Sequence, residues 1–209
     1  MGANSLHGER LLFIGAHPDD IELGCGATLA RVTSVCDVHC LTLSTRVDNP
    51  KYGDSLLETS VASLTSLGVK PEQIHFADFR SRHFSAARQE IDDELMRYKN
   101  EISADIVFAH SAHDLHQDHV VVNAEAYRIF RRNILLYENI RSTTNLEPNV
   151  LITVSKGEAQ RKIDALSLYA AFDDRDYLCS DTLSGHMRLR GLACDAEYAE
   201  AFESFRLLL

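Results

Sequence analysis

The chain has 209 residues, enough for one domain with a sizeable core, and its 45% apolar and 25% charged residues are typical of soluble globular proteins. Its formal net charge of −10 disfavours non-specific binding to nucleic acid or to an anionic membrane, because the phosphates of both are neutralised by Lys and Arg. No apolar run approaches the ~20 residues of a membrane span and the N-terminal segment lacks the pattern of a signal peptide, so we expect a single cytoplasmic domain over residues 1–209.

Six short apolar runs read as β-strands, and helical patterns separate several of them. In chain order the runs are Arg10–Ala16, Val38–Leu43, Ile74–Phe76, Asp105–Ala109, Ile134–Tyr137 and Val150–Val154. Some are almost continuously apolar, as in strands that helices cover on both faces. The alternation predicts an α/β fold of Rossmann type, in which a largely parallel sheet is flanked by helices.

Two helices are predicted between the second and the fourth of these strands. Asp54–Leu67 carries one apolar stripe and stops before Gly68, a residue suited to the position just beyond a helix end. Ser85–Ile102 also has one apolar face, and Ser85 is its predicted N-cap.

Two more helices are expected in the last third of the chain. Ser155 and Glu158 fit a capping box, which opens a helix that runs toward Phe172. The residues that share a further helical stripe, near the C-terminus, are Tyr198, Phe202 and Phe205.

Two polar motifs follow predicted strands of the sheet. AHPDD (Ala16–Asp20) comes at the end of the first strand, and DLHQDH (Asp114–His119) lies just beyond the strand Asp105–Ala109. Ligands of doubly wound sheets bind beyond the carboxyl ends of the strands, where the strand order reverses. With the order 3-2-1-4, strands one and four are neighbours, and both motifs open into one crevice. Side chains about a hundred residues apart would then share one site.

The residue types in the two motifs are typical ligands of a divalent metal. Imidazole and carboxylate groups suit zinc, and three protein ligands leave one position open, as in catalytic zinc sites. His17, Asp20 and His119 would form such a set. Asp114 or Asp118 could hydrogen-bond the second nitrogen of a ligand histidine. We predict Zn²⁺, with iron, manganese and cobalt as alternatives, because geometry and availability decide among metals bound by nitrogen and oxygen.

The paired motifs resemble those of the LmbE-like, or PIG-L-like, family of zinc-dependent N-acetylglucosaminyl deacetylases. In that family an AHPDD motif, here Ala16–Asp20, pairs with a later HxDH motif, here His116–His119. The resemblance extends to Gly24–Gly26, to Leu67–Val69 and to Tyr198–Phe202, so it covers nearly the whole chain. The two motifs are specific together, whereas either alone is a weak signal.

The resemblance implies a role for each residue at a matching position. Asp19 looks like the general base that activates water, His116 like the acid or the oxyanion stabiliser, and Asp118 like the residue that orients His116. The zinc ligands that it implies are His17, Asp20 and His119. A carboxylate outside the ligand set can take a proton from water, and a histidine can protonate a departing amine, so the chemistry agrees with these roles.

Three departures from the family pattern lie around the motifs. Ile21 follows the aspartates where the family usually has Glu, and the acidic residue comes at Glu22. Ser55 stands in place of the arginine of an Arg-x-x-Glu pattern that ends at Glu58, and His110 stands where many relatives have proline. These departures leave the ligand set intact.

Two arginines are candidates for substrate binding. Arg46, after the second strand, and Arg82 fall on segments expected near the same sheet edge, and Arg82 matches an arginine common in close relatives. Either guanidinium could bind a phosphate, a carboxylate or a sugar hydroxyl. The alternative for both is an ordinary surface arginine.

Less specific explanations compete for several residues. AHPDD alone also fits a helix N-terminus whose aspartates cap free N–H groups. For His110 and His113 we expect local packing or hydrogen bonding, and for Cys25 packing as a small apolar residue.

The sequence therefore predicts a zinc-dependent hydrolase that removes an acetyl group from an N-acetylated sugar or sugar conjugate. One alternative within the same family resemblance is a hydratase that adds water to an unsaturated acid. Another is a non-catalytic zinc-binding homologue. We expect a small-molecule N-acetyl sugar or glycoconjugate as the substrate and no nucleic-acid partner, and the sequence leaves a homo-oligomer open.

Overall fold

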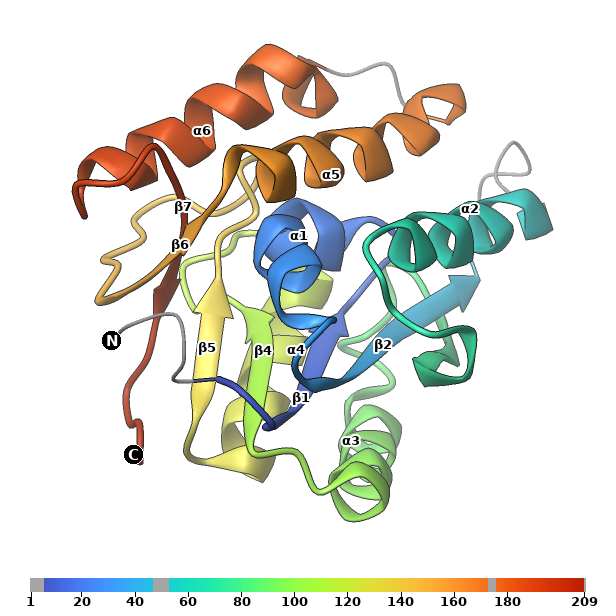
Figure 1. Cartoon of the computed structure of the whole chain (residues 1–209). Coiled ribbons are helices and arrows are strands. Elements are labelled where there is room, and N and C mark those ends of the chain that lie inside the picture. Colours follow the sequence, from blue (N-terminus) through green and yellow to red (C-terminus); the bar gives the residue numbers. More distant parts are fainter. Residues whose placement is uncertain (1–5, 47–52, 173–175, 209) are drawn as a thin grey trace.

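The computed structural model describes residues 6–46, 53–172 and 176–208, in which one β-sheet lies between two layers of helices (Figure 1). The strands are β1 (Arg10–Gly15), β2 (Asp37–Arg46), β3 (Ile74–Arg80), β4 (Ile106–His110), β5 (Ile134–Tyr137), β6 (Val150–Val154) and β7 (Tyr198–Glu203). They lie in the order β3-β2-β1-β4-β5-β7-β6. All pairings among the first five strands are parallel, and β7 is antiparallel to both neighbours. The predicted Rossmann-like fold is confirmed, and strands one and four are neighbours as expected.

Helices cover both faces of this sheet. They are α1 (Asp20–Val32), α2 (Gly53–Ser66), α3 (Arg88–Ile102), α4 (Gln117–Phe130), α5 (Lys156–Ser167) and α6 (Ser180–Leu192), with 3-10 turns η1 (Pro71–Gln73), η2 (Leu168–Ala171) and η3 (Asp176–Leu178). Leu12 and Ile14 of β1 pack with α3 and α4, whereas Leu11 and Phe13 pack with α1, α2 and α5. The two cores separate because successive side chains of a strand point to opposite faces. No helix in the described ranges is both long and apolar enough to cross a bilayer.

The predicted helix ends have mixed outcomes. Ser155 and Glu158 form the expected capping box at the start of α5, and Gly68 has a positive φ of 102° just after α2. The prediction that Ser85 caps the third helix is wrong, because α3 begins at Arg88. Residues 80–87 instead form consecutive turns that bury Phe84 completely. The loop before α3 is therefore fixed to the core by the buried side chain of Phe84.

The prediction of a C-terminal helix is also wrong. Tyr198–Glu203 form β7, which is inserted between β5 and β6 and is buried along its whole length. The spacing of four residues between Tyr198 and Phe202 fits one helical turn, but it equally fits one face of a strand. Phe205 lies beyond the strand and is 65% exposed.

Candidate metal centre

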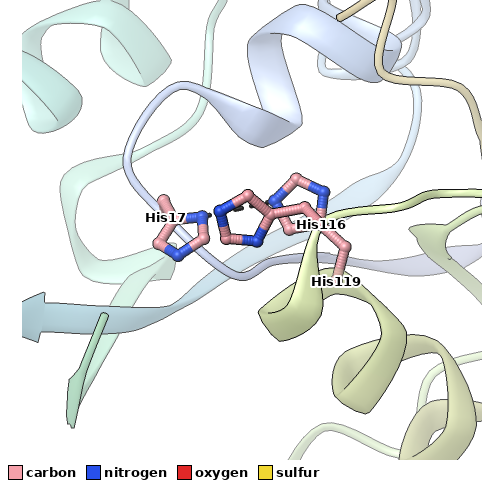
Figure 2. A group of neighbouring side chains, drawn as sticks. All are labelled: His17, His116 and His119. Carbon is pink, nitrogen blue, oxygen red and sulfur yellow. Dashed lines mark hydrogen bonds between the residues drawn. The ribbon is translucent and has the colours of Figure 1, made fainter. Parts of the chain in front are cut away.

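The two sequence motifs meet at the carboxyl ends of β1 and β4. His17 lies in the turn between β1 and α1, while His116 is the N-cap of α4 and His119 lies in its first turn. Figure 2 shows the three imidazole rings close together, although His17 comes from the turn after β1 and the other two come from the start of α4. Their ring centroids are 4.4 to 5.3 Å apart. The topology thus places both motifs in one site.

Three of the converging atoms form an almost equilateral triangle. Asp20 Oδ2 lies 3.3 Å from His17 Nδ1 and 3.3 Å from His119 Nε2, and the two nitrogens are 3.3 Å apart. Ligands held about 2.0–2.1 Å from a tetrahedral zinc ion lie roughly 3.3–3.4 Å from one another. These residues therefore have the chemistry and the spacing that fit a zinc ion. The three residues are also members of two overlapping groups with metal-binding spacing, which share His119. The groups are His17, His116 and His119, and Asp20, His110 and His119.

Each histidine of the triangle is oriented by a carboxylate on its other ring nitrogen. His17 Nε2 is 2.9 Å from Asp118 Oδ2, and His119 Nδ1 is 2.9 Å from Asp114 Oδ2. Asp114 and Asp118, which the sequence offered as alternative partners of a ligand histidine, thus each lie behind one histidine of the triangle. Burial lowers the pKa of both imidazoles, but their acidic neighbours outweigh it and raise the pKa of His17 to about 9 and that of His119 to about 10. Ligand histidines bind metal in the neutral form, so a bound cation competes with these protons.

Asp118 does not have the partner that the family resemblance implied for it. Besides His17, its carboxylate accepts hydrogen bonds from the backbone N–H of Arg82 at 2.6 Å and of Phe84 at 3.3 Å. His116 is held instead by the backbone, since the N–H of Asp118 donates to His116 Nδ1 at 3.2 Å. The Asp118 carboxylate thus orients His17 and not His116.

The hydrogen bond that His116 accepts also fixes its tautomer. Because Nδ1 is an acceptor, the proton of the neutral ring is on Nε2. Burial and the neighbouring histidines lower the pKa of His116 to about 4. A neutral His116 therefore offers one N–H donor at the metal centre.

The adjacent aspartates have opposite electrostatic surroundings. Burial, followed by the charges of Asp20 and Glu22, raises the pKa of Asp19 well above its ordinary value. Burial acts in the same direction on Asp20, but His119 and His110 outweigh it and hold its pKa well below the ordinary value. Asp19 is also left-handed, with φ 95°, and its side chain makes no capping bond to α1. Such strained non-glycine residues concentrate at functional sites.

His110 makes the local contacts expected for it, but those contacts include the metal centre. Its ring is completely buried and stacks on His119 with centroids 3.8 Å apart. Its Nε2 lies 3.1 Å from the N–H of Ala16 and 3.4 Å from Asp20 Oδ2. Burial lowers its pKa to about 4, so the ring stays neutral beside His119 and Asp20. Cys25 packs in the core as expected.

The substrate candidates are less well defined. The backbone of Arg82 touches the site through Asp118, and its carbonyl accepts a hydrogen bond from Gln117 Nε2 at 2.7 Å, while its side chain is exposed. Substrate binding by its guanidinium stays a prediction. Arg46 ends β2, and its side chain lies outside the described residues.

Sequence reasoning missed two polar residues of the loop after β5. Asn139 Nδ2 donates to Asp20 Oδ1 at 3.2 Å, and Ser142 Oγ donates to Asp114 Oδ2 at 2.9 Å. The available signal was a group of polar residues directly after a buried strand, at the same sheet edge as both motifs.

Comparisons with known proteins agree with the motifs. Residues 12–130, more than half of the chain, match the family PIG-L, described as GlcNAc-PI de-N-acetylase. The uncharacterized deacetylase YaiS of Escherichia coli K12 is 29% identical over 167 residues, which are 75% of this chain and 88% of that protein.

Two solved structures share the fold. The N,N'-diacetylchitobiose deacetylase of Pyrococcus horikoshii matches with a TM-score of 0.75 at 18% identity, over 93% of this chain and 83% of that one. GalB, the 4-carboxy-2-hydroxymuconate hydratase of Pseudomonas putida KT2440, matches with a TM-score of 0.70 at 15% identity, over 96% of this chain and 98% of that one. The family match spans both motifs and the strands that carry them, and the chain belongs to the PIG-L family.

Proposed function

We propose that this protein is a zinc-dependent hydrolase that removes the acetyl group of an N-acetylated sugar or sugar conjugate. The observation that carries the proposal is the 3.3 Å triangle of His17, Asp20 and His119. Asp19 lies outside this set and interacts electrostatically with all three of its members. Family membership and the deacetylase named among the relatives support the same reaction class.

The three residues of the triangle would hold the zinc ion, with two neutral imidazoles and one carboxylate. When bound, zinc supplies a Lewis acid that polarises an amide carbonyl and lowers the pKa of a water molecule to ~7. Asp118 and Asp114 keep the ligand nitrogens of the two histidines directed at one point.

Asp19 and His116 transfer the proton and stabilise the negative charge that develops on the carbonyl oxygen. The Asp19 carboxylate accepts a proton from the attacking water, and this proton then passes to the nitrogen of the departing amine. Burial and neighbouring carboxylates raise the pKa of Asp19, which favours proton uptake at this position. The Nε2–H of His116 donates to the carbonyl oxygen as it gains negative charge. The products are acetate and a free amine.

The adjacent aspartates allow a direct test. Asp19→Asn keeps the shape of the side chain but removes the basic oxygen, so we expect it to retain zinc and to lose ~10²–10⁴-fold in rate. Asp20→Asn should instead weaken zinc binding, because a neutral amide is a poorer ligand than a carboxylate. Elemental analysis and acetate release from a panel of N-acetyl sugars measure the two effects. Near-full activity of Asp19→Asn contradicts the mechanism, and loss of zinc by Asp19→Asn with retention by Asp20→Asn exchanges the two roles.

A hydratase is the second candidate, because a hydratase shares the fold. The same metal and the same base could activate water for addition to an unsaturated acid. Release of acetate from an N-acetyl sugar separates the two reactions, since hydration releases no acid. Asp19 and the N–H of His116 argue against a site that only binds zinc, because a structural site needs neither.

A further inference from the structure

The loop that follows β5 contacts residues of both sequence motifs at the metal centre, Asp20 of the first and Asp114 of the second. It begins with Glu138 and Asn139 and continues through Ser142 and Thr143, and no part of the proposed reaction uses it. Asn139 is 5% exposed, and Ser142 and Thr143 are half-buried. The side chains of Asn139, Ser142 and Thr143 are directed toward two buried carboxylates, those of Asp20 and Asp114.

The first contact is with the metal-ligand carboxylate. Asn139 Nδ2 donates to Asp20 Oδ1 at 3.2 Å, while Asp20 Oδ2 is the oxygen that faces the histidines. The Asn139 side chain is itself fixed, because its Oδ1 accepts a hydrogen bond from the N–H of Arg141 at 3.2 Å. Asn139 thus binds Oδ1, the Asp20 oxygen that is not part of the triangle. This contact holds the carboxylate in the orientation in which Oδ2 faces His17 and His119.

The second contact is with the carboxylate behind His119. Asp114 Oδ2 receives His119 Nδ1 at 2.9 Å, Ser142 Oγ at 2.9 Å and Thr143 Oγ1 at 3.3 Å. Its other oxygen accepts the N–H of His116 at 2.9 Å. Asp114 is 2% exposed, so these protein donors take the place of water. Ser142 makes the shorter of the two hydroxyl contacts.

The backbone of this loop is locked to the loop that carries the second motif. The N–H of Leu115 donates to the carbonyl of Ser142 at 2.9 Å, and the N–H of Thr144 donates to the carbonyl of His113 at 3.2 Å. Asp114 and Thr143 are paired in an antiparallel bridge between them. The loop is therefore a rigid support for its side chains.

We propose that Asn139 and Ser142 are positioning residues of the metal centre, Asn139 acting through Asp20 and Ser142 acting through Asp114 on His119. This inference rests on the proposed function, because it assigns the triangle to a metal. Groups that orient metal ligands are typically worth 10–100-fold in metal affinity. Asn139→Ala and Ser142→Ala should each weaken zinc binding by roughly that factor.

The test is a zinc titration of metal-free protein against a chromophoric chelator, which measures affinity without any substrate. Thr144→Ala is the matched control, because the Thr144 hydroxyl lies in the same loop and donates to the carbonyl of His113 at 3.3 Å and not to Asp20 or Asp114. Ser142→Thr keeps the hydroxyl and should restore the affinity that Ser142→Ala loses.

The outcomes separate this inference from the proposed function. Suppose that the unmodified protein binds one zinc ion and that the zinc affinity of each alanine variant is within about threefold of its affinity. The positioning role is then wrong, and the proposed function stands. If Thr144→Ala lowers the zinc affinity as much as Ser142→Ala does, the effect comes from the loop as a whole and the inference fails. An unmodified protein that binds no zinc overturns both. Thermal unfolding in excess chelator checks that each variant is folded before metal is added.

Discussion

Replacing Glu200 by Gln tests whether one buried carboxylate supports both the C-terminal strand and the helix that carries Asp20. Glu200 of β7 pairs with Lys162 of α5 at 2.6 Å, and the two side chains are 3% and 2% exposed. The same carboxylate accepts the N–H groups of Ala27 at 3.2 Å and Thr28 at 2.6 Å. These N–H groups follow Cys25, where α1 departs from helical geometry with φ −146°.

The expected loss of stability depends on which buried charges and N–H groups each substitution leaves without a partner. Glu200→Gln leaves the Lys162 ammonium buried without a counter-charge, which typically costs about 3–5 kcal/mol. The amide oxygen of Gln can still accept a hydrogen bond from the backbone N–H groups of α1. Glu200→Ala should destabilise the protein more, because it also leaves two buried N–H groups unpaired. Lys162→Met should cost less, because the carboxylate keeps its two N–H partners. Total stabilities are ~5–15 kcal/mol, so these losses are easily measured.

Urea unfolding of the four members of a double-mutant cycle measures the effect. The double variant Lys162→Met/Glu200→Gln removes both charges, and we expect it to be more stable than Glu200→Gln alone, with a coupling energy of roughly 2 kcal/mol or more. A coupling energy near zero, with both single variants within about 1 kcal/mol of the unmodified protein, contradicts this reasoning. It would mean that water or a rearranged side chain replaces the ion pair.

Three further outcomes are expected. His119→Ala removes one vertex of the triangle and should abolish turnover and sharply lower zinc content, and full zinc occupancy by elemental analysis would refute the ligand assignment. Arg82→Ala should lower kcat/KM at unchanged zinc content, whereas unchanged kinetics would exclude its guanidinium from substrate binding. Burial opposes ionisation of Glu138, but His186 and Arg190 outweigh it and lower its pKa from 4.5 to about 2. The contribution of Glu138 to stability, about 3 kcal/mol at most, is therefore present above pH ~4.5 and lost as the pH falls toward 2. Glu138→Gln should be less stable than the unmodified protein at pH 7 and about equally stable near pH 2, which urea unfolding at both pH values can check.

The parts of the fold that the sequence predicted are those set by local patterns and by general topology. The strands Ile134–Tyr137 and Val150–Val154 have the expected bounds, since apolar runs between polar segments leave few alternatives. The meeting of the two motifs followed from the rule that ligands bind where strand order reverses. The C-terminal strand was not predictable in this way. Glu200 is buried because Lys162 lies opposite it, and the two residues are 38 positions apart in sequence.

The meeting of the two motifs' residues at the candidate site was predicted, but their side-chain directions were not. The family resemblance implied that Asp118 orients His116, whereas in the structure its carboxylate lies behind His17, 101 residues away. The reason is the loop before α3, in which Arg82 is left-handed with φ 68° and its N–H turns toward Asp118. The contacts of Asn139 and Ser142 were missed for a similar reason, because loop conformation and not periodicity determines them.

The spacing within the second motif has a physical explanation in the first turn of α4. His116 and His119 are three residues apart, so their imidazoles lie on one side of the helix, with ring centroids 4.4 Å apart. His116 is also the N-cap, and its ring accepts the otherwise unpaired N–H of Asp118. Asp118 can therefore direct its carboxylate to His17 while its backbone fixes His116. One helix start thus supplies the proposed zinc ligand, an N–H donor and an orienting carboxylate, and a one-residue insertion between His116 and His119 should separate these groups and abolish zinc binding.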